Sequence, residues 1–191
     1  MTVYKYTLYL ILIILTAYMH PLFGINTSND TVVLLHGLGR TKKSMSSLEK
    51  TLKKNGYHVI NLNYPSKKHT IKTLVDTYLK PVIDTIPPDQ TIHFVTHSMG
   101  GILVRYYLNE YPLSSCGHVV QIAPPNHGSE LVDHLGKYAF FQNVMGPAFQ
   151  ELSTQNQSVP NQLPIPSYSI GIIIGTASLN PYFLGSWYKG A

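Results

Sequence analysis

Short apolar runs alternate with longer amphipathic stretches along the chain. The apolar runs are rich in Val, Ile and Leu, which is typical of buried strands; they lie at 31–35, 57–61, 92–95, 118–123 and 168–174. The amphipathic stretches repeat apolar residues every three or four positions and predict helices; they lie at 42–55, 70–86 and 102–110. Strands that alternate with helices predict an α/β protein whose parallel sheet is covered on both faces.

Specific expectations concern the ends of these elements. The helix over 42–55 is expected to start from a cap on Thr41 or Ser44. Pro81 is expected to kink the helix over 70–86 or to end it early, because proline lacks an amide hydrogen and crowds the preceding turn. Further along, residues 159–167 are rich in Pro, Asn and Gln, and this composition predicts a loop.

The stretch Thr91–Arg105 reads TIHFVTHSMGGILVR and places Ser98 between a predicted strand and a predicted helix. A serine hydroxyl is a weak nucleophile unless it is held beside a base and beside donors for the developing oxyanion. A sharp strand-to-helix turn pushes Oγ outward and directs the N–H of Met99 toward the reacting oxygen. Gly100 supplies the small residue that such a turn needs two positions after the serine, whereas Thr96 replaces the usual glycine two positions before it. The alternative for this stretch alone is an ordinary helix that opens with a Ser-Met-Gly-Gly turn.

Three segments, in this order, resemble the α/β-hydrolase superfamily in its lipase-like branch of triacylglycerol lipases and esterases. The first is His36-Gly37-Leu38-Gly39, directly after a predicted strand, and the second is the turn Thr96–Gly101. The third, Ala123–Ser129, is similar to the segment that such lipases carry before their mobile cover. The resemblance runs from about Thr31 to Pro181.

This resemblance implies an α/β-hydrolase domain over residues 25–191, with 124–158 as its cover region. It implies Ser98 as the nucleophile and the backbone N–H groups of Leu38 and Met99 as the oxyanion hole. The implied reaction is hydrolysis of a carboxylic ester, of a small molecule or a lipid, through an acyl-Ser98 intermediate and without a cofactor. The apolar residues of the cover region suit an acyl chain, and they suit core packing equally well.

The catalytic acid and base depart from the pattern of the superfamily, in which the acid and then the histidine follow the serine along the chain. Beyond Ile174 the sequence has no Asp, Glu or His. The superfamily has a variant position for the acid just after the strand that ends at Ala123, which nominates Glu130 or Asp133. The base would then come from His127, from His134 or from another subunit. The expectation is a C-terminally truncated fold that lacks its last strand and its catalytic-histidine loop. The alternative function is an impaired or inactive relic, or a binding module.

The first 24 residues differ from the rest of the chain. Lys5 is their only charged side chain, and residues 6–17 are nearly all apolar. This pattern is typical of a secretory signal peptide, and residues 6–23 are also just long enough for an N-terminal membrane anchor. Both alternatives predict that the protein is extracytoplasmic, either secreted or periplasmic or anchored in a membrane.

The composition excludes several other classes of function. The net charge is +5, but the basic residues concentrate in 40–54 and at Lys67-Lys68 without interleaved aromatics, so no nucleic-acid partner is predicted. The single cysteine, Cys116, permits no internal disulfide. The nine histidines do not occur at the spacing of a structural zinc site, and no metal is predicted.

Overall fold

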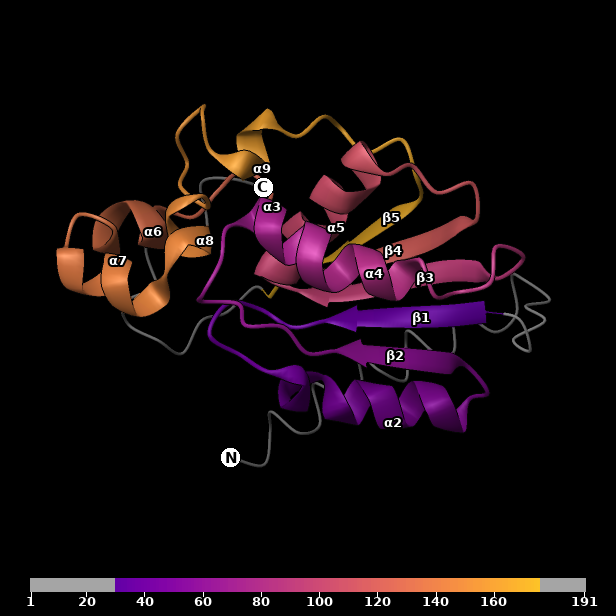
Figure 1. Cartoon of the computed structure of the whole chain (residues 1–191). Helices are drawn as coiled ribbons and strands as arrows, with labels where there is room; N and C mark the ends of the chain where they lie inside the picture. Colours follow the sequence, from indigo (N-terminus) through magenta and orange to yellow (C-terminus); the bar gives the residue numbers. More distant parts are fainter. Residues whose placement is uncertain (1–29, 176–191) are drawn as a thin grey trace.

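The computed structural model describes residues 30–175, and its centre is a five-stranded parallel sheet (Figure 1). The strands follow the spatial order β2-β1-β3-β4-β5. Their bounds are β1 Asp30–Leu35, β2 His58–Leu62, β3 Thr91–His97, β4 Cys116–Ile122 and β5 Ile170–Ile173. The prediction of a parallel α/β sheet is therefore confirmed.

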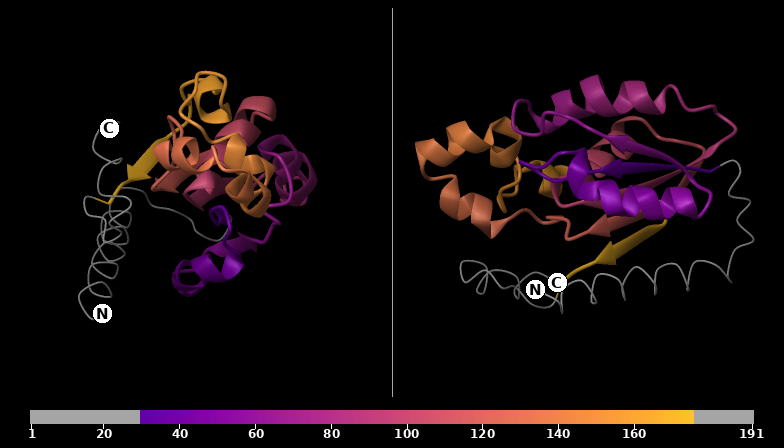
Figure 2. Two further views of the ribbon diagram at one scale, coloured as in Figure 1. Left: turned by 90° about the vertical axis from the view of Figure 1, so that its left-hand side faces the viewer. Right: turned by 90° about the horizontal axis from the view of Figure 1, so that it is seen from below.

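Helices cover both faces of this sheet, as Figure 2 shows from two sides. Successive residues of a strand point to opposite faces, so β1 contributes Val33 and Leu35 to one core and Val32 and Leu34 to the other. The first core contains the helices that follow β2 and β3: α3 Ile71–Leu74, the π-helical turn η3 Val75–Leu79, α4 Lys80–Ile83 and α5 Met99–Glu110. The second core contains Met45, Leu48 and Leu52 from the 3-10 turn η2 Lys42–Met45 and from α2 Ser46–Lys54.

The start of the first helix differs from the expected cap. Thr41 precedes η2 in an extended conformation, but its side chain makes no capping hydrogen bond. The hydroxyl of Ser44 donates to the Thr41 carbonyl oxygen at 2.9 Å, and no amide within residues 30–175 donates to it as a cap would require. The chain enters α2 through a 3-10 turn instead, which satisfies the first amides with i to i+3 bonds.

The helical run is irregular just before Pro81, and it ends at Ile83, earlier than the expected residue 86. The run continues from Ile71 through the π-helical turn Val75–Leu79 into Lys80–Ile83. Pro81 stands at the start of the last of these helices, where its missing amide hydrogen costs least. The wider π turn before it removes the crowding that proline would cause in a regular α-helix.

Four short helices follow β4, and the last of them corrects the predicted loop over 159–167. Three lie within residues 124–158: α6 Glu130–Leu135, α7 Ala139–Met145 and α8 Pro147–Gln150. The fourth, α9 Val159–Gln162, is a single turn that begins on Ser158, whose carbonyl oxygen accepts from the amides of Asn161 and Gln162. Pro160 occupies one of its first positions, where a helix requires no amide hydrogen.

The expectations for the two ends of the chain concern residues outside the described part. These are the leader over 1–24 with its membrane segment 6–23, and the expected lack of a further strand and of a catalytic-histidine loop after β5. Within residues 30–175 no helix is both long enough and apolar enough to cross a bilayer.

Candidate active site

Ser98 occupies a strained turn between β3 and α5. Its φ and ψ are 52° and −125°, a backbone conformation that residues other than glycine rarely adopt. Two hydrogen bonds hold the turn: the Ser98 amide donates to the Ile122 carbonyl oxygen at 2.9 Å, and the Gly101 amide donates to the Ser98 carbonyl oxygen at 2.9 Å. This is the geometry of a nucleophile elbow, which keeps the hydroxyl at the carboxyl edge of the sheet.

Close packing explains the glycine two residues after Ser98. A Cβ on Gly100 would lie 2.8 Å from the Leu35 carbonyl oxygen and 3.0 Å from that of His36. The start of α5 therefore touches the end of β1 directly. The threonine two residues before the serine fits because Thr96 is buried and its hydroxyl reaches the Val120 carbonyl oxygen at 3.4 Å. The departure from glycine at this position does not disturb the turn.

The loop after β1 lies directly against the serine turn. Leu35 is paired with Thr96 in the sheet, so the residues that follow each of them run side by side. A Cβ on Gly37 would lie 3.1 Å from the Cβ of Ser98 and 2.9 Å from Nδ1 of His97. Within residues 30–175 no hydrogen-bond acceptor is recorded for the amides of Leu38 and Met99. Two unpaired amides that flank a serine are what an oxyanion hole requires.

His36 and Tyr64 fix the shape of this loop. Their rings stack with centroids 4.1 Å apart and planes at 8°, and the Tyr64 hydroxyl donates to the His36 carbonyl oxygen. His36 is fully buried, and its Nδ1 lies 2.9 Å from the Gly37 carbonyl oxygen. His36 therefore supports the loop from within the core.

Three histidines of the sheet region are held in their neutral form. Burial lowers the pKa of His36, His93 and His97 below the ordinary value of 6.5. The positive charge of Arg40 lowers the pKa of His97 further. The turn therefore has a neutral imidazole on one side of Ser98.

These lowered pKa values predict that the fold becomes less stable as the pH falls below about 6.5. Between the lowered pKa of the folded state and 6.5, the unfolded chain binds more protons, so acidification favours unfolding. Urea unfolding at pH 5, 6, 7 and 8 measures this dependence. The His97→Asn variant should retain only part of it. A free energy of unfolding that stays constant from pH 5 to pH 7 would contradict the prediction.

The candidates for acid and base are not joined to Ser98 by any hydrogen bond within residues 30–175. Asp133, on α6, accepts from the Thr154 amide at 3.0 Å and from the Thr154 hydroxyl at 2.6 Å. Glu130 is exposed in the first turn of α6, and His127 is exposed in the loop before it. Asp133 thus ties the cover region together, and its carboxylate is already engaged.

Replacing Asp133 with alanine is expected to lower the free energy of unfolding by about 1 kcal/mol, because both hydrogen bonds to Thr154 are lost. The matched variant Glu130→Ala removes an exposed carboxylate on the same helix and should change the free energy by less than about 0.5 kcal/mol. Chemical denaturation of both variants makes the comparison. Equal effects of the two substitutions would count against a structural role for Asp133.

Sequence reasoning missed Arg105, which anchors the segments around Asn126 and Leu163 to α5. Arg105 is buried, and its guanidinium donates to the carbonyl oxygens of Asn126, Leu163 and Pro164 at 3.1, 3.2 and 3.4 Å. An arginine on the otherwise apolar face Ile102–Leu108 was the only available signal. Most of its partners are backbone atoms, which no side-chain pattern reveals; the exception is Oδ1 of Asn126, at 3.3 Å.

Replacing Arg105 with methionine is expected to lower the free energy of unfolding by about 2–3 kcal/mol, because several backbone carbonyls lose a charged donor. Limited proteolysis should show faster cleavage within residues 124–168. The control is Arg40→Met, which removes an exposed guanidinium. Unchanged stability and cleavage for Arg105→Met would rule out the anchor.

The cover region presents an aromatic surface. The side chains of Tyr138, Phe140 and Val144 are 56%, 69% and 43% exposed, although all three are apolar or aromatic. The region packs onto the rest of the fold at Gly146, whose φ is +79° and where a Cβ would collide with the Lys67 carbonyl oxygen. The cover thus rests on the loop after β2 and leaves aromatic side chains in solvent.

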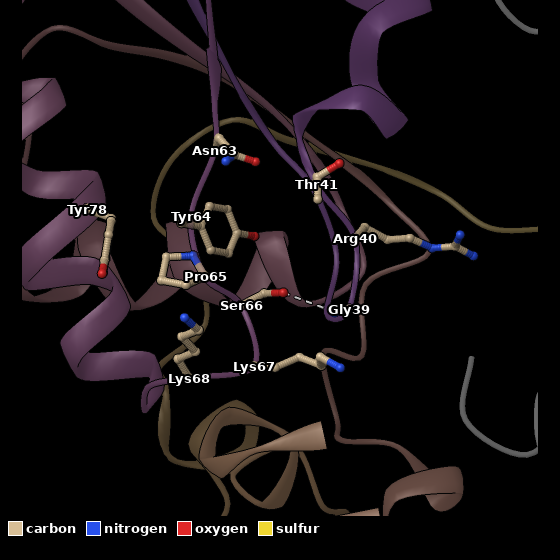
Figure 3. Close-up of a pocket in the computed structure, with 10 residues that line it drawn as sticks. All are labelled: Gly39, Arg40, Thr41, Asn63, Tyr64, Pro65, Ser66, Lys67, Lys68 and Tyr78. Carbon is tan, nitrogen blue, oxygen red and sulfur yellow. Dashed lines mark hydrogen bonds between the residues drawn. The ribbon is translucent and has the colours of Figure 1, made fainter. Parts of the chain in front are cut away.

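A cavity of about 470 Å³ lies beside the loop after β1, and Figure 3 shows the residues that line it. They come from the loops that follow β1 and β2 and from η3: Gly39, Arg40, Thr41, Asn63, Tyr64, Pro65, Ser66, Lys67, Lys68 and Tyr78. Ser98 is not among them. Across residues 30–175, no group of three His, Cys, Asp or Glu side chains could hold a metal ion.

Several solved structures are similar to this chain. Phospholipase PlaB from Legionella pneumophila in complex with thio-NAD matches with a TM-score of 0.63 and 18% identity, over 77% of this chain and 38% of that chain. The metagenomic carboxyl esterase MGS0156 matches with a TM-score of 0.59 and 22% identity, over 71% of this chain and 46% of the esterase. Bacillus licheniformis lipase BlEst2 in its mature form matches with a TM-score of 0.53 and 20% identity, over 70% and 58%.

These structures share the α/β-hydrolase fold with this chain, which spans less than half the length of the first two. A search of curated proteins gives no match. The family model of palmitoyl protein thioesterases matches residues 31–168, which include the loop His36–Arg40 and the serine turn. The match covers most of the chain, and the protein therefore belongs to the palmitoyl protein thioesterase family of lipase-like α/β-hydrolases.

Proposed function

We propose that this chain acts as a serine hydrolase on acyl esters or thioesters, with Ser98 as the nucleophile. The observation that carries the proposal is the strained backbone of Ser98, with φ of 52°, directly beneath the loop His36–Arg40. Strain of this kind persists only where the surrounding structure enforces it, and it is typical of functional positions.

In the proposed reaction, Oγ of Ser98 attacks the carbonyl carbon and a base takes its proton. The carbonyl oxygen gains a negative charge, which the amides of Leu38 and Met99 stabilise by hydrogen bonds. The carbon–oxygen or carbon–sulfur bond to the leaving group then breaks, and the alcohol or thiol leaves with a proton. Water attacks the resulting acyl-Ser98 ester in a second, equivalent step and releases the acid.

An acyl chain is the proposed apolar part of the substrate. The exposed side chains Tyr138, Phe140 and Val144 on the cover offer a surface for a lipid or for a fatty acyl group. The family is that of the palmitoyl protein thioesterases, and the similar structures include a phospholipase, an esterase and a lipase. A thioester and an oxygen ester of a long acyl chain are therefore the first substrates to test.

A second candidate is a protein that binds acyl groups without turning them over. One observation favours it: the carboxylate of Asp133 is engaged by Thr154, and no histidine within residues 30–175 hydrogen-bonds to Ser98. Under this alternative the serine turn is retained because Gly100 and Gly37 make it part of the packing. The two candidates differ in whether Ser98 is activated.

Labelling with a fluorophosphonate tests activation directly, because only an activated serine reacts with this probe rapidly. The wild-type chain should be labelled, and Ser98→Ala should not. Ser129→Ala, in the loop before α6, is the matched control and should be labelled like the wild type. If the wild-type protein is folded but not labelled, the enzyme proposal is rejected and the acyl-binding alternative is kept.

We also propose that the protein acts outside the cytoplasm. The apolar segment 6–23 supports this as a signal peptide or as a membrane anchor. Expression of the full chain followed by fractionation and N-terminal sequencing distinguishes the two. Mature protein that starts near residue 25 indicates cleavage, intact protein in the membrane fraction indicates an anchor, and intact protein in the cytoplasm would reject both.

A further inference from the structure

The cavity beside the loop His36–Arg40 is lined by positive charges that have no ion-pair partner in the described part of the chain. Arg40, Lys67 and Lys68 line it, and no Asp or Glu does. All three side chains are exposed, and none of them takes part in the ion pairs found within residues 30–175. The other lysines that follow β2 differ, since Lys72 and Lys80 are paired with acids on their own helices.

Uncharged donors complete the lining. Ser66 accepts a hydrogen bond from the Gly39 amide at 3.0 Å, so its own hydroxyl hydrogen remains available. Asn63 uses Oδ1 to accept from the Lys42 amide at 3.1 Å, which leaves its Nδ2 as a donor. In Figure 3, the side chains of Arg40 and Lys67 both point to the right from the two loops, while Lys68 lies at the left near Pro65.

The cavity is formed by the fold before any ligand binds. The two hydrogen bonds from Gly39 to Ser66 and from Lys42 to Asn63 join the two loops that form its walls. Tyr64, which also lines it, is fixed from below by its stack on His36. The backbone of Lys67 is held from the other side by Gly146 of the cover. A preformed site loses little entropy on binding.

The same loop connects this cavity to the serine turn. Gly37 touches Ser98, Leu38 follows with no acceptor for its amide among residues 30–175, and Gly39 and Arg40 already line the cavity. A substrate whose carbonyl lies at Ser98 could therefore place its leaving group in the cavity. Three cations and several neutral donors around about 470 Å³ suit a group with two negative charges and several acceptor oxygens.

We infer that this cavity binds a phosphoryl group and, building on the proposed function, that the group is carried on the leaving-group side of the acyl ester. Free phosphate could supply the same chemistry as a separate ligand. The experiment therefore has two arms, one of which does not depend on catalysis.

The first arm measures binding of inorganic phosphate to the Ser98→Ala variant by titration calorimetry, at constant ionic strength with chloride as the reference anion. Exposed charge contacts are each worth about two- to fivefold in affinity, so Lys67→Gln/Lys68→Gln should weaken binding on the order of tenfold. The control Lys54→Gln removes an exposed, unpaired lysine from the last turn of α2 and should bind phosphate like its parent. Circular dichroism checks that each variant is folded.

The second arm compares KM for two esters that differ only in the phosphate, a 1-acylglycerol 3-phosphate and the same 1-acylglycerol. The wild type should have the lower KM for the phosphorylated ester. In Lys67→Gln/Lys68→Gln the ratio of the two KM values should shift about tenfold toward the neutral ester. Lys54→Gln should keep the wild-type ratio.

The outcomes separate the two sources. Weakened phosphate binding together with a shifted KM ratio supports a phosphoryl group on the substrate. Weakened binding with an unchanged ratio supports the cavity as a site for free phosphate and overturns the substrate assignment. Phosphate that binds no better than chloride overturns the inference altogether. If neither ester is hydrolysed, the proposed function fails while the binding arm still decides the cavity.

Discussion

Replacing Ser98 with alanine is expected to lower the turnover of an acyl ester on the order of 10³-fold or more. Alanine removes Oγ, so no acyl-enzyme can form and only binding and the oxyanion hole remain. The backbone of alanine meets the same restriction at φ of 52° as serine does. The free energy of unfolding should therefore change by less than about 1 kcal/mol.

The comparison uses purified full-length protein and a short-chain chromogenic ester beside a long-chain thioester. Ser129→Ala is the matched control, because Ser129 lies in the same chain outside the serine turn and makes no side-chain cap bond. It should retain wild-type turnover. If Ser98→Ala keeps more than a tenth of the wild-type rate, another residue or a contaminant performs the hydrolysis.

Replacing Gly100 with valine is expected to cause the largest loss of stability, about 3 kcal/mol or more. The new Cβ alone would lie 2.8 Å from the Leu35 carbonyl oxygen and 3.0 Å from that of His36. Both are backbone atoms of a buried strand end, so they cannot move aside at low cost. The chain would have to separate α5 from β1, which also displaces the loop that carries the Leu38 amide.

Gly171→Val is the matched control for this substitution. Gly171 lies on the edge strand β5, and a Cβ there would meet no atom within 4 Å. Its free energy of unfolding should change by less than about 0.5 kcal/mol, since β-branched residues suit strands. Urea unfolding and fluorophosphonate labelling are measured on both variants. A Gly100→Val protein as stable as Gly171→Val would mean that the turn is less tightly packed than described.

The sheet and the serine turn were predictable from the sequence because local patterns determine both. Residues 32–35 form a continuous apolar run, and residues 92–95 are apolar except for His93; such runs suit strands that are buried on both faces. The turn was predictable because Gly100 and Gly101 follow Ser98-Met99, and an ordinary helix start does not require two glycines there. In each case the physical cause lies within about ten residues of sequence.

The missed features depend on atoms that are distant in the sequence. Arg105 is held by the carbonyl oxygen of Leu163, 58 residues away, and backbone acceptors leave no mark in a side-chain pattern. The single helical turn at Val159–Gln162 forms because Ser158 and Pro160 suit its first positions, although its composition is typical of a loop. In the sequence, Lys67 and Lys68 have the pattern of ordinary surface charges. Only the fold shows that their loop lies at the same cavity as Arg40.

The central claim, that Ser98 is the nucleophile, is tested most directly by trapping the covalent intermediate. Full-length protein is mixed with a chromogenic butyrate ester, quenched with acid within seconds, and digested for mass spectrometry. The account predicts a butyryl group on Ser98 in the wild type and none in Ser98→Ala. An acyl group on a different residue, or rapid hydrolysis without any acylated peptide, would contradict it.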